Sequence, residues 1–100
     1  MCGIIGIASN KLVASNIIHS LKKLEYRGYD SAGIATIVSG EINEKKCAGR
    51  VDNLEKMLFK NPSSGFLGIG HVRWATHGVP SQANAHPHSS EEVSVVHNGI

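Results

Sequence analysis

The second residue of the chain is a cysteine, and only a methionine stands before it. Removal of Met1 is generally easy when its neighbour is small, and it would give Cys2 both a thiol and a free α-amine. An α-amine has an intrinsic pKa of about 7.7–8.0, so part of it is neutral at cellular pH and can accept a proton. Nucleophile and general base would then belong to one residue, as in enzymes with an N-terminal threonine. Position alone favours a simpler interpretation, in which Cys2 is a small apolar residue opening a buried strand.

A second group of candidate side chains lies within residues 71–78, after an apolar run. It combines a guanidinium, an indole, a hydroxyl and an imidazole within five positions, namely Arg73, Trp74, Thr76 and His77. A guanidinium can hold a carboxylate through two parallel hydrogen bonds, which lysine cannot reproduce. Taken as an isolated pair, however, Arg73 would form an ion pair at the surface and Trp74 would be an anchor of the core.

Asn98 and Gly99 follow the last apolar run. Asn-Gly is above all typical of turns, and that is the simpler interpretation. A side-chain amide followed by a backbone N–H can also form an oxyanion hole, where one such donor changes the rate by roughly a hundredfold to a thousandfold.

Arg27 stands in a polar segment, residues 26–33, where a predicted helix gives way to a strand. Its guanidinium is always charged and would stabilise a thiolate placed beside it. The same residues also suit an ordinary turn, with Gly28 supplying the backbone conformation and Asp30 or Ser31 a local hydrogen bond. Taken alone, the segment favours the turn.

Other kinds of site have little support in the sequence. The six histidines include His86 and His88, but their spacings match no common zinc pattern, and no glycine-rich phosphate loop is present. We therefore expect neither a metal nor a cofactor. A net charge of +2 without a basic run gives no support for nucleic-acid binding. Short apolar runs and the lack of signal-peptide features predict a cytoplasmic protein that does not enter a membrane, with reduced cysteines.

One hundred residues, 41% apolar and 18% charged, suit a single small domain. The hydrophobic patterns predict five strands, at residues 3–8, 32–38, 41–48, 66–72 and 93–96. A first helix is predicted from an apolar stripe at three- and four-residue steps, formed by Leu12, Val13, Ile17, Ile18, Leu21 and Leu24.

Glycines and polar residues mark the predicted boundaries. Gly28 is expected to follow the first helix with a positive φ. A second helix would be capped by Asp52, with Leu54, Met57 and Leu58 facing inward. Gly68 and Gly70 predict a strand closely approached by another backbone or a ligand. Residues 76–90 would be a long functional loop, and Cys47 a structural residue.

Together these segments resemble one family in order and spacing. The matching stretches are Met-Cys-Gly-Ile at the start, residues 24–33, 71–78 and 84–88, and His97-Asn98-Gly99. They are similar to the N-terminal glutaminase domain of the glucosamine-6-phosphate synthases, within the class II glutamine amidotransferases. The residues around Arg27 and Arg73 are closer to these hexosamine enzymes than to the purine-pathway members of the class.

This resemblance implies an α+β fold, the four-layer αββα sandwich of the N-terminal-nucleophile hydrolases, of which residues 1–100 would be the N-terminal part. It implies that Cys2, after loss of Met1, attacks the side-chain amide of glutamine while its own α-amine moves the proton. Asn98 and the Gly99 N–H would hold the oxyanion, and Arg27 would lie beside the nucleophile.

The substrate pocket is implied in the same way. Arg73 would bind the α-carboxylate of glutamine, Thr76 and His77 would line the pocket, and Trp74 would belong to the loop that closes over it. His86 would support the site from further away.

In that family the released ammonia passes to sugar-isomerase domains, where fructose 6-phosphate becomes glucosamine 6-phosphate, and we expect the full enzyme to be a homodimer. Residues 1–100 contain no such domains, so we expect a fragment that is inactive alone. Two alternatives stay open: another class II amidotransferase with a different acceptor, and a non-catalytic module that binds glutamine or a partner.

Overall fold

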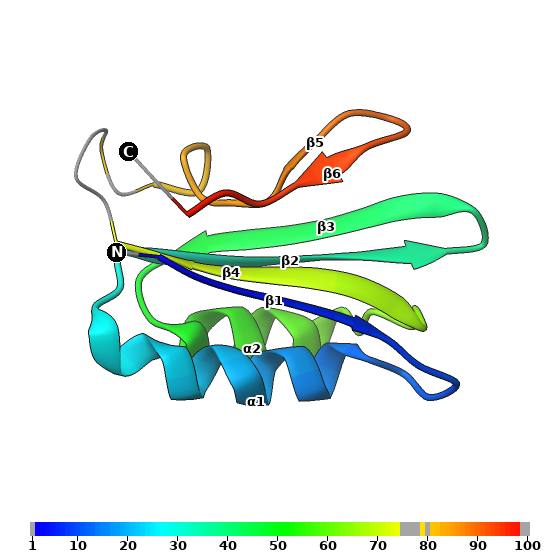
Figure 1. The fold of residues 1–100 in the computed structure, drawn as a ribbon, viewed down its shortest axis with the longest axis horizontal. Helices are drawn as coiled ribbons and strands as arrows, with labels where there is room; N and C mark the ends of the chain where they lie inside the picture. The colour runs from blue at the N-terminus through cyan, green and yellow to red at the C-terminus, as the bar shows by residue number, and fades with distance from the viewer. Residues whose placement is uncertain (1, 75–78, 80, 99–100) are drawn as a thin grey trace.

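A four-stranded antiparallel sheet lies between two helices on one face and a C-terminal segment on the other (Figure 1). The computed structural model describes residues 2–74, 79 and 81–98. The elements are β1 (Gly3–Ala8), α1 (Ala14–Leu24), the 3-10 turn η1 (Glu25–Arg27), β2 (Ser31–Val38), β3 (Glu41–Ala48), α2 (Val51–Lys60), β4 (Leu67–Arg73), β5 (His88–Ser89) and β6 (Ser94–Val95). The strand order is β1-β4-β2-β3, with β5 and β6 forming a separate pair. The predicted α+β class is confirmed.

The strand predictions are confirmed for the main sheet and only in part for the C-terminal segment. Strands β1 and β3 have the expected bounds, and β2 and β4 differ by one residue. Ser39 and Gly40 connect β2 to β3 with φ values of 53° and 78°. Two successive positive φ angles give a turn whose twist matches that of the hairpin strands. The expected strand 93–96 is reduced to two residues, and it pairs with β5, which arises within the predicted loop.

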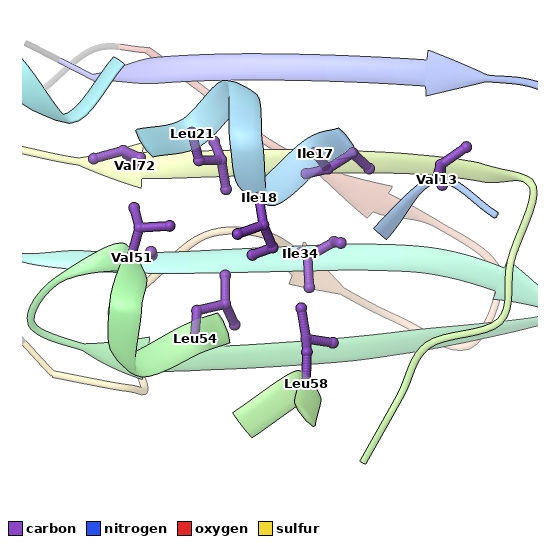
Figure 2. Close-up of a cluster of buried hydrophobic side chains, with 10 residues drawn as sticks. Val13, Ile17, Ile18, Leu21, Ile34, Val51, Leu54, Leu58 and Val72 are labelled. Carbon is purple, nitrogen blue, oxygen red and sulfur yellow. The ribbon is translucent and has the colours of Figure 1, made fainter. Parts of the chain in front are cut away.

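The core lies between the sheet and the helices (Figure 2). Helix α1 contributes its buried stripe, α2 a second one, and β2 and β4 one large side chain each: Val13, Ile17, Ile18, Leu21, Val51, Leu54, Leu58, Ile34 and Val72. Leu12 was expected to join them, but its residue is 54% exposed. This prediction is wrong because α1 begins only at Ala14, so Leu12 precedes the helical periodicity.

Helix α2 begins one residue before the predicted cap. Asp52 lies inside the helix, and Arg50 occupies the cap position without a capping hydrogen bond of its own side chain. The cap is supplied from another part of the chain, because the Val51 N–H donates to Glu25 Oε2 at 2.8 Å. Arg50 Nη2 also lies 3.2 Å from Glu25 Oε1. A carboxylate at a helix N-terminus satisfies an orphan donor and complements the helix dipole, so Glu25 ties α2 to the end of α1.

The glycines of β4 make room for helix α1. A Cβ built on Gly70 would lie 2.5 Å from Cγ2 of Ile17, and one on Gly68 would lie 2.9 Å from Cδ1 of the same residue. The close approach predicted for this strand is therefore confirmed: it is made by the Ile17 side chain and, at Gly68, also by the backbone oxygen of Ala35, 3.0 Å from the added Cβ. In the described part of the chain, no helix is long and apolar enough to cross a membrane.

Alternation along the strands separates the two faces of the sheet. On β1, a Cβ at Gly3 would contact Leu24 of α1, and on β4, Val72 belongs to the core under the helices. Since successive side chains point to opposite faces, Cys2, His71 and Arg73 belong to the other face. That is the face on which residues 81–98 lie (Figure 1).

The C-terminal segment reaches this face through a glycine of β2. A Cβ on Gly33 would lie 1.9 Å from the carbonyl oxygen of His86 and 2.9 Å from Cδ of Pro87. No side chain fits there, so the segment rests directly on the backbone of the sheet.

Replacing Gly33 should therefore detach this segment. We expect Gly33→Ala to destabilise the protein by about 1–3 kcal/mol, the usual cost of overpacking. Gly6→Ala is the matched control, because its Cβ would make only an ordinary contact of 3.8 Å with Ile69. Thermal or urea unfolding of both variants measures the difference. Equal unfolding midpoints would contradict the packing described here.

Candidate active site

The backbone nitrogen of Cys2 donates a hydrogen bond to Oδ1 of Asn98 at 3.0 Å. It joins the start of β1 to the end of the described chain, at the end of the sheet where β4 finishes and β2 begins (Figure 1). Cys2 is buried and Asn98 is exposed. A backbone nitrogen can only donate, so the oxygen of the Asn98 amide must face Cys2 and its NH₂ group must face elsewhere.

A second hydrogen bond holds the same stretch of chain. Nε2 of His71, on β4, lies 2.8 Å from the carbonyl oxygen of His97. That carbonyl belongs to the peptide unit that leads into Asn98. The segment is thus attached to β1 through a side chain and to β4 through its backbone.

Arg73, at the end of β4, lies beside a buried carboxylate. Its Nη1 is 3.7 Å from Oδ1 of Asp30, and the two side chains are only 11% and 9% exposed. The same nitrogen donates to the carbonyl oxygen of Val79 at 3.3 Å, and the backbone N–H of Asp30 donates to the Arg73 carbonyl at 2.7 Å. The surface ion pair considered from the sequence is therefore a largely buried one. Ser31 donates to Asp30 at 2.8 Å, which is the local hydrogen bond expected in this turn.

Trp74 is no core anchor, since it is 47% exposed. Its indole lies against Gly28, where an added Cβ would come within 2.6 Å of Cδ2. Gly28 has φ of 118°, the positive value expected after a helix, although the 3-10 turn η1 separates it from α1. The segment around Arg27 and the segment around Arg73 thus contact each other through Gly28 and Trp74.

Arg27 is exposed at the end of η1. The start of β1 does lie near the end of α1, because Gly3 contacts Leu24. The placement of Arg27 beside the Cys2 thiol stays a prediction. Three further candidates, Thr76, His77 and Gly99, lie outside the described residues.

A histidine of β4 and a histidine of the C-terminal segment stack against each other. The rings of His71 and His86 have centroids 4.2 Å apart and an interplanar angle of 16°, and His88 lies 4.5 Å from His86 at a tilt. Burial lowers the pKa of His86 to about 4, helped by the neighbouring His71, His88 and Arg73. Burial also lowers the pKa of His71, against the opposing effect of its bond to the His97 carbonyl.

Both rings are therefore neutral at neutral pH, so neither adds a positive charge between the sheet and the segment. Nδ1 of His71 and Nδ1 of His86 are buried and have no hydrogen-bond partner among the described residues. In the same part of the chain, no group of three or more His, Cys, Asp or Glu is arranged to hold a metal ion. Cys2 and Cys47 are both free thiols, and burial raises the pKa of Cys47.

This arrangement offers the parts of an acyl-transfer site. A buried cysteine has its own nitrogen hydrogen-bonded to an amide oxygen, the amide NH₂ is directed away from that nitrogen, and a guanidinium lies at the end of the adjacent strand. Nucleophile, oxyanion donor and carboxylate-binding group can act together when they are held in fixed geometry.

Sequence reasoning missed two residues of this region. Asp30 was assigned only a turn hydrogen bond, yet its carboxylate also lies against Arg73. His71 was considered only as one histidine among six, yet it holds the backbone next to Asn98. The alternation of β4 was the available signal, since it places His71 and Arg73 on one face.

No family model matches the chain. The chain is 57% identical, over all 100 of its residues, to glutamine–fructose-6-phosphate aminotransferase (isomerizing) of Mesorhizobium japonicum, of which the match covers 16%. It is 58% identical over 102 aligned residues to the protein of the same name from Clostridium acetobutylicum, covering 17% of it. The one from Brucella suis is 56% identical over the whole chain.

Along its whole length the chain is therefore related to enzymes that are aminotransferases by name. It is similar over its whole length to the isomerizing glutamine–fructose-6-phosphate aminotransferases, and it spans 16–17% of the length of the relatives it matches. The resemblance seen in the motifs is confirmed.

The neutral state of His86 makes the stability of the protein dependent on pH. The pKa of this histidine falls from an ordinary 6.5 to about 4 on folding. Between these values the unfolded chain binds more protons than the folded one, so the free energy of unfolding should decrease as the pH falls from 6.5 towards 4. In His86→Phe, which keeps an aromatic ring in the stack, the decrease should be smaller. Urea unfolding at a series of pH values measures it, and identical slopes for the two proteins would contradict the assignment.

Proposed function

We propose that this chain carries the catalytic cysteine of a glutaminase, which releases ammonia from the side-chain amide of glutamine. The observation that supports it best is the 3.0 Å hydrogen bond between the nitrogen of Cys2 and Oδ1 of Asn98. After removal of Met1, that nitrogen becomes a free α-amine. The names of the relatives make glutamine the nitrogen donor that fits this chemistry.

The first step forms a tetrahedral intermediate bonded to the sulfur of Cys2, which becomes a thioester when ammonia leaves. The thiol of Cys2 gives its proton to the neutral α-amine, directly or through a water molecule, and its sulfur attacks the amide carbon of glutamine. An amine that donates an N–H to Asn98 still has its lone pair for this proton. The negative charge that develops on the amide oxygen is stabilised by Nδ2 of Asn98, and in our proposal also by the N–H of Gly99.

The second step releases the products. The protonated amine gives its proton to the leaving nitrogen, and the carbon–nitrogen bond breaks to free ammonia. A water molecule then attacks the thioester, the amine accepts one of its protons, and glutamate leaves while the Cys2 thiol is restored. No metal or cofactor takes part in these steps.

The buried ion pair suits a substrate clamp. Asp30 lies against one terminal nitrogen of Arg73, which orients the planar guanidinium at the end of β4. A guanidinium has five N–H donors in a fixed fork, so it can contact Asp30 and a second carboxylate together. We propose that the second carboxylate is the α-carboxylate of glutamine. Trp74, Thr76 and His77 would surround it, Arg27 would lie beside the thiol, and His86 would support the site from below.

The wider setting follows from the relatives' name. We propose that the ammonia is used by sugar-isomerase domains to convert fructose 6-phosphate into glucosamine 6-phosphate, in a homodimeric cytoplasmic enzyme. The helix-covered sheet described here would be one half of the four-layer αββα sandwich of the N-terminal-nucleophile hydrolases. We also propose that residues 1–100 alone have little glutaminase activity.

Substitution of the nucleophile tests the main proposal. In the full-length protein that carries this sequence, Cys2→Ala should abolish the release of glutamate from glutamine, because it removes the sulfur that attacks the amide in this proposal. Cys47→Ala is the control and should retain activity, since this thiol lies on β3 and no role is proposed for it. Undiminished activity in Cys2→Ala, or an active protein whose intact mass includes Met1, would overturn the mechanism.

Substitution of Arg73 separates substrate binding from chemistry. Arg73→Lys keeps the charge but loses the two parallel hydrogen bonds. We expect KM for glutamine to rise by about tenfold or more, the factor that corresponds to roughly 1.4 kcal/mol of lost binding, with a smaller effect on kcat. Steady-state kinetics of glutamate release measures both constants. A variant with unchanged KM would show that Arg73 serves only to hold Asp30.

A further inference from the structure

His71 is a buried histidine for which the mechanism above has no use. It is fully buried on β4, and its only described hydrogen bond goes from Nε2 to the carbonyl oxygen of His97, at 2.8 Å. A carbonyl oxygen can only accept, so Nε2 carries the hydrogen and, in the neutral ring, Nδ1 does not. The tautomer of His71 is thereby determined by the segment it holds.

The plane of the ring is also determined. His86 stacks on it at 4.2 Å, and the backbone of His86 can lie so close to the sheet only because Gly33, the β2 partner of His71, has no side chain. A ring fixed in tautomer and in plane directs its Nε2–H along one line. That line ends at the peptide unit that precedes Asn98.

We propose that His71 is a positioning residue, which places the Asn98 amide over Cys2 by holding the His97 carbonyl. The proposal rests on the glutaminase function proposed above. Two hydrogen bonds, one to the side chain of Asn98 and one to the carbonyl next to it, define where this amide lies relative to the nucleophile. Without the second, the segment would still be packed on Gly33, but the peptide unit next to Asn98 would lose its fixed position, and with it the amide NH₂ its fixed direction towards the oxyanion.

The proposed role of His71 does not depend on its protonation state. Around its ring lie Arg73 on the same strand, Asp30 before β2, and His86 and His88 from the C-terminal segment. A protonated ring would add a charge to this cluster but would still donate from Nε2. The holding interaction should therefore persist across the pH range in which the enzyme is folded.

A pair of amide variants in the full-length protein tests this role. The side chain of Gln reaches about as far as Nε2 of histidine, so His71→Gln can still donate to the His97 carbonyl. Asn is one methylene shorter, so His71→Asn cannot. We expect His71→Asn to lower kcat for glutamate release by about tenfold to a hundredfold, part of the full effect of an oxyanion donor, with little change in KM. His71→Gln should restore most of the loss.

The same substitution in an Asn98→Ala background separates positioning from general damage. If His71 acts through Asn98, adding His71→Asn to Asn98→Ala should cause no further loss in kcat, because interacting residues are not additive. Equal losses in the Gln and Asn variants, or a full additional loss in the double variant, would overturn the proposal. A loss of folding would appear as an additive effect and count against it.

The outcome is separable from that of the proposed function. Activity that survives Cys2→Ala would refute the glutaminase mechanism itself. An inactive Cys2→Ala together with a fully active His71→Asn would leave that mechanism in place and refute only the role of His71.

Discussion

The hydrogen bond between Cys2 and Asn98 joins residues 96 positions apart. Closing a loop of that length costs on the order of 4 kcal/mol in chain entropy, whereas one hydrogen bond contributes only about 0.5–1.5 kcal/mol. The contact cannot hold the segment by itself. It exists because the packing of the segment on Gly33 and the bond from His71 to His97 have already brought Asn98 to the edge of the sheet.

The two faces of the sheet differ in polarity. The face towards the helices is apolar, and the glycines of β4 bring α1 close to it. The other face has polar side chains at one end, where β1 begins and β4 ends. Because β1 and β4 are antiparallel neighbours, with Gly3 opposite Val72, Cys2 and Arg73 emerge side by side. A cysteine at the tip of a strand can thus lie next to a guanidinium that is 71 positions away in the sequence.

The regular part of the fold could be predicted from the sequence, because its signals are local. The apolar run of β1, the positive-φ turn at Ser39 and Gly40, and the stripe of α1 each follow from neighbouring residues. The candidate residues also stood out by type and spacing, and the structure brings Cys2 and Asn98 into contact.

What could not be predicted depends on contacts between distant segments. Residues 81–98 have no periodicity, and their location is decided by a missing side chain at Gly33 and a stacked imidazole. The Asp30 carboxylate resembled a turn residue because its partner, Arg73, lies on another strand. The cap of α2 was assigned to Asp52 because the acceptor that serves, Glu25, is 26 positions away from the donor.

That borrowed cap has a consequence for the order in which the chain folds. Helix α2 has ten residues, fewer than the roughly 12–15 at which an isolated helix becomes even marginally stable in water. Its first N–H finds an acceptor only after α1 and η1 have placed Glu25 beside it. Helix α2 therefore cannot serve as an independent folding nucleus. On the nascent chain it should become stable only after α1 and η1 have formed.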